Sequence, residues 1–152
     1  MGIARHSGYG KPHRQWLPTV WCLGYTAVTI SYAVPPSIVI VDDHAGFRSC
    51  ARRLLESEGY RVIGEAVDGG SGLSSARKLH PELMLVDVCL PDIDGFELAA
   101  QLHALDPRPT VILTSSRDCA ELESLTAEGC ACGVVPKDKL SGEVLDQLLA
   151  RA

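Results

Sequence analysis

The chain lacks the sequence patterns of a zinc site, a disulfide framework and a nucleotide-binding loop. Its six cysteines form no C-x-x-C pair, and Cys130 and Cys132 make a lone C-x-C without histidine partners nearby. This spacing argues against a zinc site or a disulfide framework, and we expect small buried thiols in a reducing cytoplasm. The glycine-rich stretch at residues 69–72 matches neither a P-loop nor G-x-G-x-x-G, so we interpret it as a turn.

Acidic residues are absent from positions 1–36, and no charged residue lies between Gln15 and Val41. Three bases precede this uncharged run, an arrangement shared by signal peptides and membrane anchors. The run is interrupted by Pro18 and several hydroxyl residues, and it continues directly into an apolar segment. We therefore expect residues 1–36 to be a disordered extension or an incorrectly assigned start, with a membrane anchor over residues 15–36 or a docking segment as alternatives.

The remaining residues, 37–152, carry 11 bases and 19 acids, a net charge of −8. A surface this acidic has no general attraction to nucleic acid, and we expect no direct nucleic-acid binding. The length suits one domain with a substantial core, which we assign to residues 37–152.

Short apolar runs alternate with amphipathic segments five times after Pro36. The predicted strands are residues 37–41, 61–65, 82–86, 110–114 and 133–136, and the predicted helices are residues 45–58, 68–79, 95–105, 118–128 and 140–151. Five such units predict an α/β fold with a doubly wound parallel sheet, strand order 2-1-3-4-5, and helices on both faces.

Polar and charged residues stand at the ends of four of these strands: Asp42 and Asp43, Asp87, Ser115 and Lys137. The carboxyl ends of parallel strands converge on one crevice, where open α/β sheets place their sites. The spacing therefore predicts one pocket that holds three carboxylates, one hydroxyl and one ammonium group.

A carboxylate at the tip of a buried strand is rigid and partly desolvated, which suits a nucleophile, and we predict Asp87 as a phosphoacceptor. Neighbouring carboxylates recruit a cation, and Mg²⁺ prefers oxygen ligands. We expect Asp87, Asp43 and the backbone carbonyl of Cys89 to bind Mg²⁺ directly and Asp42 to hold it through water. Lys137 and Ser115 would then contact the phosphoryl oxygens.

These motifs resemble the receiver domains of two-component response regulators over residues 37 to about 151. The likeness rests on the paired acids, Asp87 with its following Leu-Pro and Asp-Gly pairs, the Thr-Ser pair ending at Ser115, and Lys137. It implies a flavodoxin-like (βα)5 fold, Mg²⁺ dependence, and phosphoryl transfer from a sensor histidine kinase or phosphotransfer protein. It also implies slow self-dephosphorylation and no further enzymatic activity. The first helix is most similar to receivers that carry a LuxR-type output domain.

Two features depart from the receiver pattern. Val134 occupies the position, three residues before Lys137, where receivers commonly carry the Tyr or Phe of a rotamer switch. No output domain follows Arg151, so we expect a stand-alone cytoplasmic receiver. Its signal would pass through the face formed by the fourth helix, fifth strand and fifth helix, to a downstream protein or a phosphorylation-dependent homodimer.

Two alternatives remain open from the residues. The chain could be a docking module that works without phosphorylation, which Val134 favours. It could also be a hydrolase with an aspartyl-phosphate intermediate, as haloacid-dehalogenase-like phosphatases are. Such an enzyme needs a second Asp two residues after its nucleophile, and Cys89 stands at that position.

Overall fold

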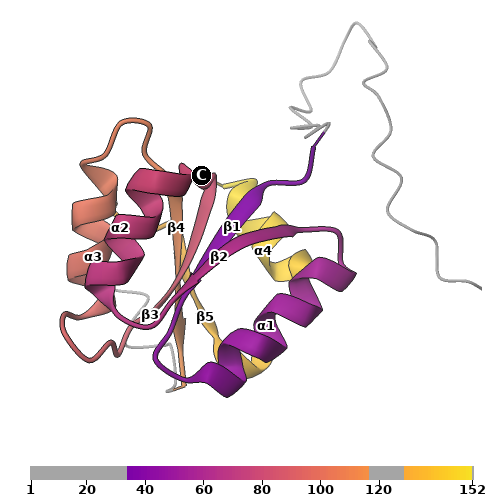
Figure 1. Ribbon diagram of the computed structural model, residues 1–152. Helices are drawn as coiled ribbons and strands as arrows, with labels where there is room; N and C mark the ends of the chain where they lie inside the picture. The colour runs from indigo at the N-terminus through magenta and orange to yellow at the C-terminus, as the bar shows by residue number, and fades with distance from the viewer. Residues whose placement is uncertain (1–33, 117–128, 152) are drawn as a thin grey trace, which may run out of the picture. The chain divides into compact units, whose positions relative to one another are not determined.

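The computed structural model describes residues 34–116 and 129–151 (Figure 1). Five strands and four helices lie within these ranges. The strands are β1 (Ser37–Val41), β2 (Arg61–Ala66), β3 (Leu83–Asp87), β4 (Thr110–Ser115) and β5 (Gly133–Pro136). The helices are α1 (Ala45–Ser57), α2 (Gly69–Leu79), α3 (Gly95–His103) and α4 (Gly142–Leu149).

All strand pairs are parallel, and the sheet order is β2-β1-β3-β4-β5. The fold class and strand order predicted from the sequence are therefore confirmed. The register sets Val41 beside Val86 and Asp87 beside Thr114, so the carboxyl ends of β1, β3 and β4 lie next to one another.

Helices cover both faces of the sheet, α2 and α3 on one side and α1 and α4 on the other (Figure 1). Each side has its own cluster of buried apolar side chains. Leu98 and Leu102 of α3 pack in the first cluster, and Leu55 of α1 and Leu145 of α4 pack in the second. Strands β1 and β3 are buried along their whole length, which explains why they are continuous apolar runs rather than alternating ones.

Side-chain caps fix where the helices begin. Asp68 forms a capping box with Ser71 at α2, and the Asp94 carboxylate accepts from Glu97 N at α3. Ser141 caps α4, so this helix begins two residues later than predicted, and it ends at Leu149. The preceding Lys137–Lys139 segment forms a 3₁₀ turn.

Other predicted boundaries shift by one or two residues. Asp87 and Ser115 are the last residues of β3 and β4, whereas the prediction placed them just after the strands. Helix α3 ends at His103, two residues early, and the Leu105 N–H donates to the Leu102 carbonyl oxygen at 3.1 Å in a tighter turn. The predicted helix over residues 118–128 and the extension up to residue 33 lie outside the described residues. No helix within the described part of the chain is both long and apolar enough to cross a bilayer.

The expected burial of the cysteines is wrong for two of the four described. Cys50 lies on the outer face of α1 and Cys89 in the loop after β3, and both are exposed. Cys130 and Cys132 are partly buried, and they pack against different apolar clusters on the two sides of the sheet. Cys22 and Cys119 lie outside the described residues.

Candidate functional site

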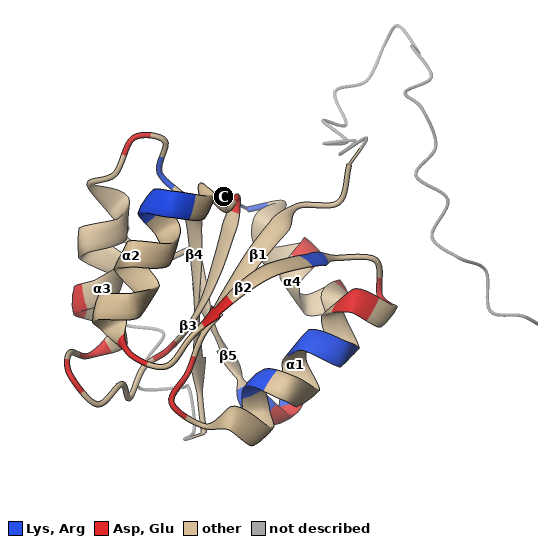
Figure 2. Ribbon diagram, in the orientation of Figure 1, with Lys and Arg blue, Asp and Glu red and all other residues tan. Residues whose placement is uncertain are grey.

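Three carboxylates meet at the carboxyl ends of β1 and β3. Ligand atoms of Asp42, Asp43, His44 and Asp87 all lie within 4.8 Å of one another. Asp42 is completely buried and Asp87 is 4% exposed, whereas the Asp43 side chain is 39% exposed. Figure 2 shows acidic segments where β1 passes into α1 and in the loop between β3 and α3.

The Lys137 ammonium group joins two of these acids. Its Nζ lies 2.6 Å from Oδ2 of Asp42 and 3.0 Å from Oδ2 of Asp87. The same nitrogen lies 4.7 Å from the centre of the Phe47 ring, within cation–π range. Burial lowers the pKa of Lys137, but its ion pairs with Asp42 and Asp87 together outweigh burial, and the pKa is raised. Lys137 is therefore held in its charged form by the site itself.

The pKa of Asp87 is raised above its ordinary value, chiefly because burial disfavours the charged carboxylate. Hydrogen bonding and charge from Lys137 counteract this, and the charge of Asp42 adds to it. One ammonium thus faces three carboxylates, and the excess negative charge suits a hard divalent cation with oxygen ligands. The donor set fits Mg²⁺, and of the predicted ligands Asp43 is partly exposed whereas Asp87 is buried.

Residues at the start of α1 hold the paired acids in place. The His44 backbone N–H donates to Oδ1 of Asp42 at 2.8 Å, and His44 Nδ1 lies 2.6 Å from Oδ1 of Asp43. Arg48 donates to the Asp42 carbonyl oxygen at 2.6 Å and to Glu65 of β2 at 3.2 Å. The sequence did not reveal the roles of Phe47 and Arg48, because both contacts join separate elements.

The turn after Asp87 requires a glycine at position 95. A Cβ on Gly95 would lie 2.4 Å from the Asp87 carbonyl oxygen and 2.8 Å from Cα of Val88. The Gly95 N–H donates to the Val88 carbonyl at 2.8 Å, which closes the loop tightly on itself. The Asp94–Gly95 pair thus starts α3 and brings the loop close to the end of β3.

Ser115 and Val134 take their places from the strand register. Ser115 is 3% exposed and pairs with Pro136, so it lies at the strand end between Asp87 and Lys137. Val134 is 9% exposed and packs in the apolar cluster on the α2 and α3 side. Asp42, Asp43, Asp87 and Lys137 are therefore brought together directly, with Ser115 on the next strand. Cys89 lies in the exposed loop, and its backbone N–H donates to Asp87.

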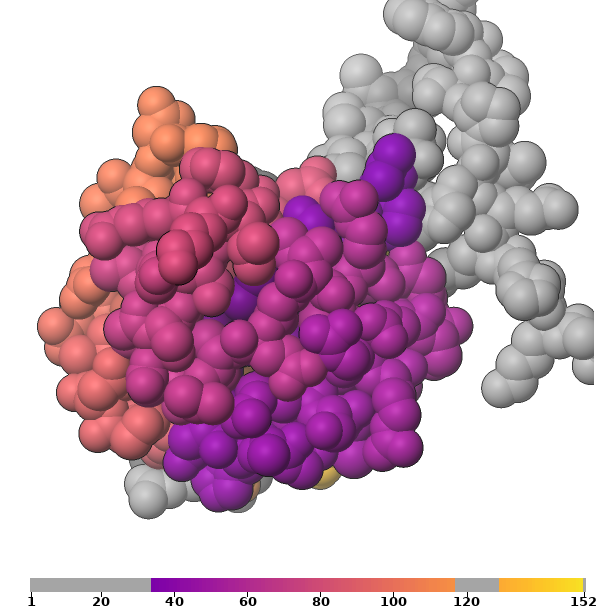
Figure 3. Space-filling model, in the orientation of Figure 1, coloured from indigo at the N-terminus to yellow at the C-terminus, as the bar shows by residue number. Residues whose placement is uncertain are grey.

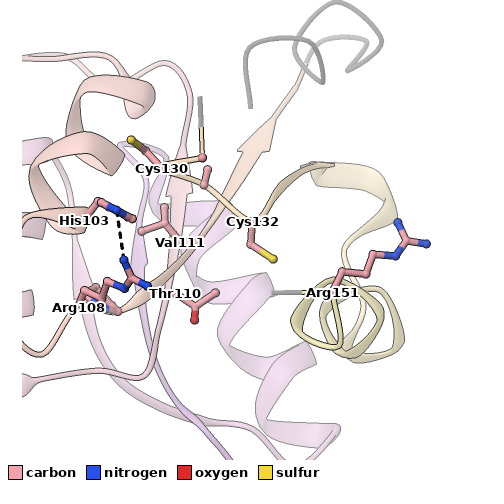
Figure 4. A pocket seen from close by; sticks show the side chains of 10 residues that line it. His103, Arg108, Thr110, Val111, Cys130, Cys132 and Arg151 are labelled. Atoms are coloured by element: carbon pink, nitrogen blue, oxygen red, sulfur yellow. Dashed lines mark hydrogen bonds between the residues drawn. The ribbon is translucent and has the colours of Figure 1, made fainter. Parts of the chain in front are cut away.

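A pocket lies at the end of the sheet opposite the acidic cluster, at the start of β4 and before β5 (Figure 4). It has a volume of about 350 Å³. Figure 4 shows His103 and Arg108 joined to each other, Arg151 extending away, and the thiols of Cys130 and Cys132 pointing in different directions. These groups do not converge on a common point, so among the described residues the better candidate for a functional site is the acidic cluster.

This fold and this acidic site define a class of signalling domain. Residues 38–148 match the response regulator receiver domain family. The chain belongs to that family, which serves two-component signalling.

Named relatives agree with this assignment. BvgA of Bordetella pertussis is 37% identical over 114 residues, 72% of this chain and 52% of BvgA. The transcriptional regulatory protein AfsQ1 of Streptomyces coelicolor is 32% identical over 111 residues, 73% of this chain and 48% of AfsQ1. The receiver domain of NarL from Mycobacterium tuberculosis has a TM-score of 0.68 at 29% identity, covering 76% of this chain and 98% of that domain. The chain spans about half the length of BvgA and AfsQ1.

Proposed function

We propose that Asp87 is the phosphoacceptor of this receiver and that the transfer depends on Mg²⁺. The observation that carries the proposal is the position of the Asp87 carboxylate. It is buried at the end of β3, bonded to Lys137, and grouped with Asp42 and Asp43. A nucleophile in this setting is rigid. Lys137 is already positioned to stabilise the negative charge that develops during the transfer.

The transfer balances as a displacement at phosphorus. An Asp87 carboxylate oxygen forms the new O–P bond while the N–P bond to the phosphohistidine of a sensor kinase or phosphotransfer protein breaks. The departing imidazole nitrogen keeps the electron pair and takes up a proton. Asp43, Asp87 and the Cys89 carbonyl would hold Mg²⁺, with Asp42 acting through water. When bound, the ion supplies positive charge beside the phosphoryl oxygens.

Phosphorylation would redistribute the contacts of Lys137. As an acyl phosphate, Asp87 loses its carboxylate charge and becomes a weaker partner for the ammonium group, while the phosphoryl group carries roughly one and a half to two negative charges. Lys137 and Ser115 then turn toward the phosphoryl oxygens, which strains the ends of β4 and β5. The response leaves through β5 and the helix after it, toward a downstream protein or a second copy of the chain. Self-dephosphorylation is the only hydrolysis expected, and the kinase partner sets a cytoplasmic location.

A phosphorylation-independent docking module is the second candidate. Its support is Val134, which is packed in the core and has no aromatic ring to rotate. The two functions differ in one result. If Asp87→Asn left every partner interaction unchanged in the presence of donor and Mg²⁺, docking without phosphorylation would replace the switch.

The direct test is intact-mass spectrometry after incubation with acetyl phosphate, with and without Mg²⁺. We expect the wild-type chain to gain one phosphoryl group only when Mg²⁺ is present. Asp87→Asn serves as the matched variant and should gain none. Equal phosphorylation of the wild type and Asp87→Asn, or phosphorylation of the same extent with and without Mg²⁺, would contradict the proposed function.

A further inference from the structure

The loop that follows the proposed phosphoacceptor is fastened to the start of α2 by one carboxylate. Oδ1 of Asp92 accepts from the Gly69 backbone N–H at 2.8 Å, and Oδ2 accepts from the Gly70 N–H at 2.9 Å. Both oxygens of one side chain therefore hold the first two amides of a helix to which Asp92 does not belong. These two bonds are also the chief reason that the pKa of Asp92 is lowered.

The glycines at the start of α2 make this approach possible. A Cβ on Gly69 would lie 2.4 Å from Cγ1 of Ile93 and 3.2 Å from Oδ1 of Asp92. Ile93 itself packs against the apolar cluster between the sheet and α2 and α3. The glycine-rich stretch is therefore the surface on which the loop rests.

The loop after Asp87 is also held by backbone contacts within it, so the attachment at Asp92 restrains the whole loop. Cys89 and Asp94 form an isolated antiparallel bridge, and the Gly95 N–H bonds to the Val88 carbonyl. Only Leu90 and Pro91 lie between Cys89 and Asp92. A displacement of Asp92 from α2 would therefore be transmitted to the Cys89 backbone.

We infer that Asp92 is a positioning residue for the acidic site, tying the loop after Asp87 to α2 and thereby setting the place of the Cys89 carbonyl. The inference rests on the proposed function in one respect, namely that this carbonyl binds the metal. Outer hydrogen-bond partners of metal ligands typically matter for affinity even though they never touch the ion.

The chain offers a matched control in Asp68. Its carboxylate also serves the start of α2, by accepting from Ser71 N at 2.7 Å. Asp68→Ala removes a hydrogen bond at the start of α2 but leaves the loop after Asp87 attached to it. Asp92→Ala removes hydrogen bonds at the start of α2 and also detaches the loop from the helix. Two measurements on the full chain separate the effects: Mg²⁺ affinity by calorimetry, and hydrogen exchange of the loop amides without metal.

We expect Asp92→Ala to weaken Mg²⁺ binding by about 10-fold, the lower end of such effects, and to speed exchange at residues 88–94. Asp68→Ala should leave the affinity within about two-fold, a free-energy change well below 1 kcal/mol. Unchanged hydrogen exchange in Asp92→Ala would show that Asp92 does not hold the loop to α2. Faster exchange with unchanged affinity, or equal loss in both variants, overturns the positioning role. A wild-type chain that binds no Mg²⁺ contradicts the metal site and with it the positioning role, while the exchange data still decide on the tie.

Discussion

Lys137 Nζ lies 2.6 Å from Oδ2 of Asp42, a carboxylate with no exposed surface. The pair joins the end of β1 to the residue that follows β5, across the two strands between them. Since Lys137 also bonds Asp87, the ammonium group is the one cation that these buried acids share among the described contacts. Any change in the charge of Asp87 must therefore change the electrostatic interactions of the Lys137 ammonium group.

Phe47 should contribute to the position of Lys137. The ring lies 4.7 Å from Nζ and flanks the ammonium from α1. A cation–π contact of this kind is worth about 0.5–1 kcal/mol when it is partly exposed. In a double-mutant cycle of Phe47→Leu and Lys137→Met, followed by urea unfolding, we expect a coupling energy of about that size. Strictly additive effects would show that the ring only fills space.

Asp87→Asn should stabilise the metal-free protein at pH 7. The raised pKa of Asp87 means that its ionised form costs free energy in the folded state. This cost grows as the pH rises above the unfolded-state pKa and is complete once the pH exceeds the folded-state pKa. Removing the charge should raise the unfolding free energy by about 1 kcal/mol and Tm by about 3–5 °C. Circular dichroism melts without Mg²⁺ measure this.

Added Mg²⁺ provides the control for that variant. It should raise the Tm of the wild type more than that of Asp87→Asn, because only the wild type offers all three carboxylates. If Asp87→Asn melted below the wild type without metal, Asp87 would stabilise the fold, contrary to the expectation that its charge destabilises the fold and is retained for function.

Gly95→Ala should be strongly destabilising. Its Cβ would lie 2.4 Å from the Asp87 carbonyl oxygen, so backbone must move. We expect a loss of about 2–4 kcal/mol in urea unfolding. Gly46→Ala is the control, since a Cβ there meets nothing within 4 Å and alanine favours the helix. Similar losses at both positions would contradict the close approach.

Glu65→Gln should reveal a pH-dependent contribution from the arginines of α1. Hydrogen bonds from Arg52 and then Arg48 lower the pKa of Glu65 below its usual value of 4.5. The ionised carboxylate therefore adds stability above pH 4.5, and this is lost as the pH falls through the folded pKa.

At pH 7 the variant should melt about 2–4 °C below the wild type, as expected for a partly exposed ion pair of about 0.5–1 kcal/mol. At pH 3 the two melting temperatures should converge. A difference that is constant from pH 3 to 7 would assign the effect to packing.

Much of the fold follows from local pattern. The buried strands are continuous apolar runs, and their parallel order places Asp42, Asp87 and Lys137 at one edge. Helix starts at Asp68 and Asp94 could be predicted because a capping side chain acts on its own helix. Such signals depend on neighbours in the chain and are visible in the sequence.

The contacts that refine the site could not be predicted in the same way. Phe47 over Lys137 and Asp92 on Gly69 each join elements far apart in the chain, and no spacing rule connects them. The exposure of Cys50 depends on the rotation of α1 about its axis, which the preference of cysteine for burial does not determine.

We expect the phosphoryl group to reside on Asp87. Borohydride reduces an acyl phosphate to an alcohol, so a phosphorylated aspartate becomes homoserine. Peptide mapping by mass spectrometry after treatment with acetyl phosphate, Mg²⁺ and borohydride should find homoserine at position 87. Homoserine at Asp42 or Asp43, or none at any position, would contradict the account.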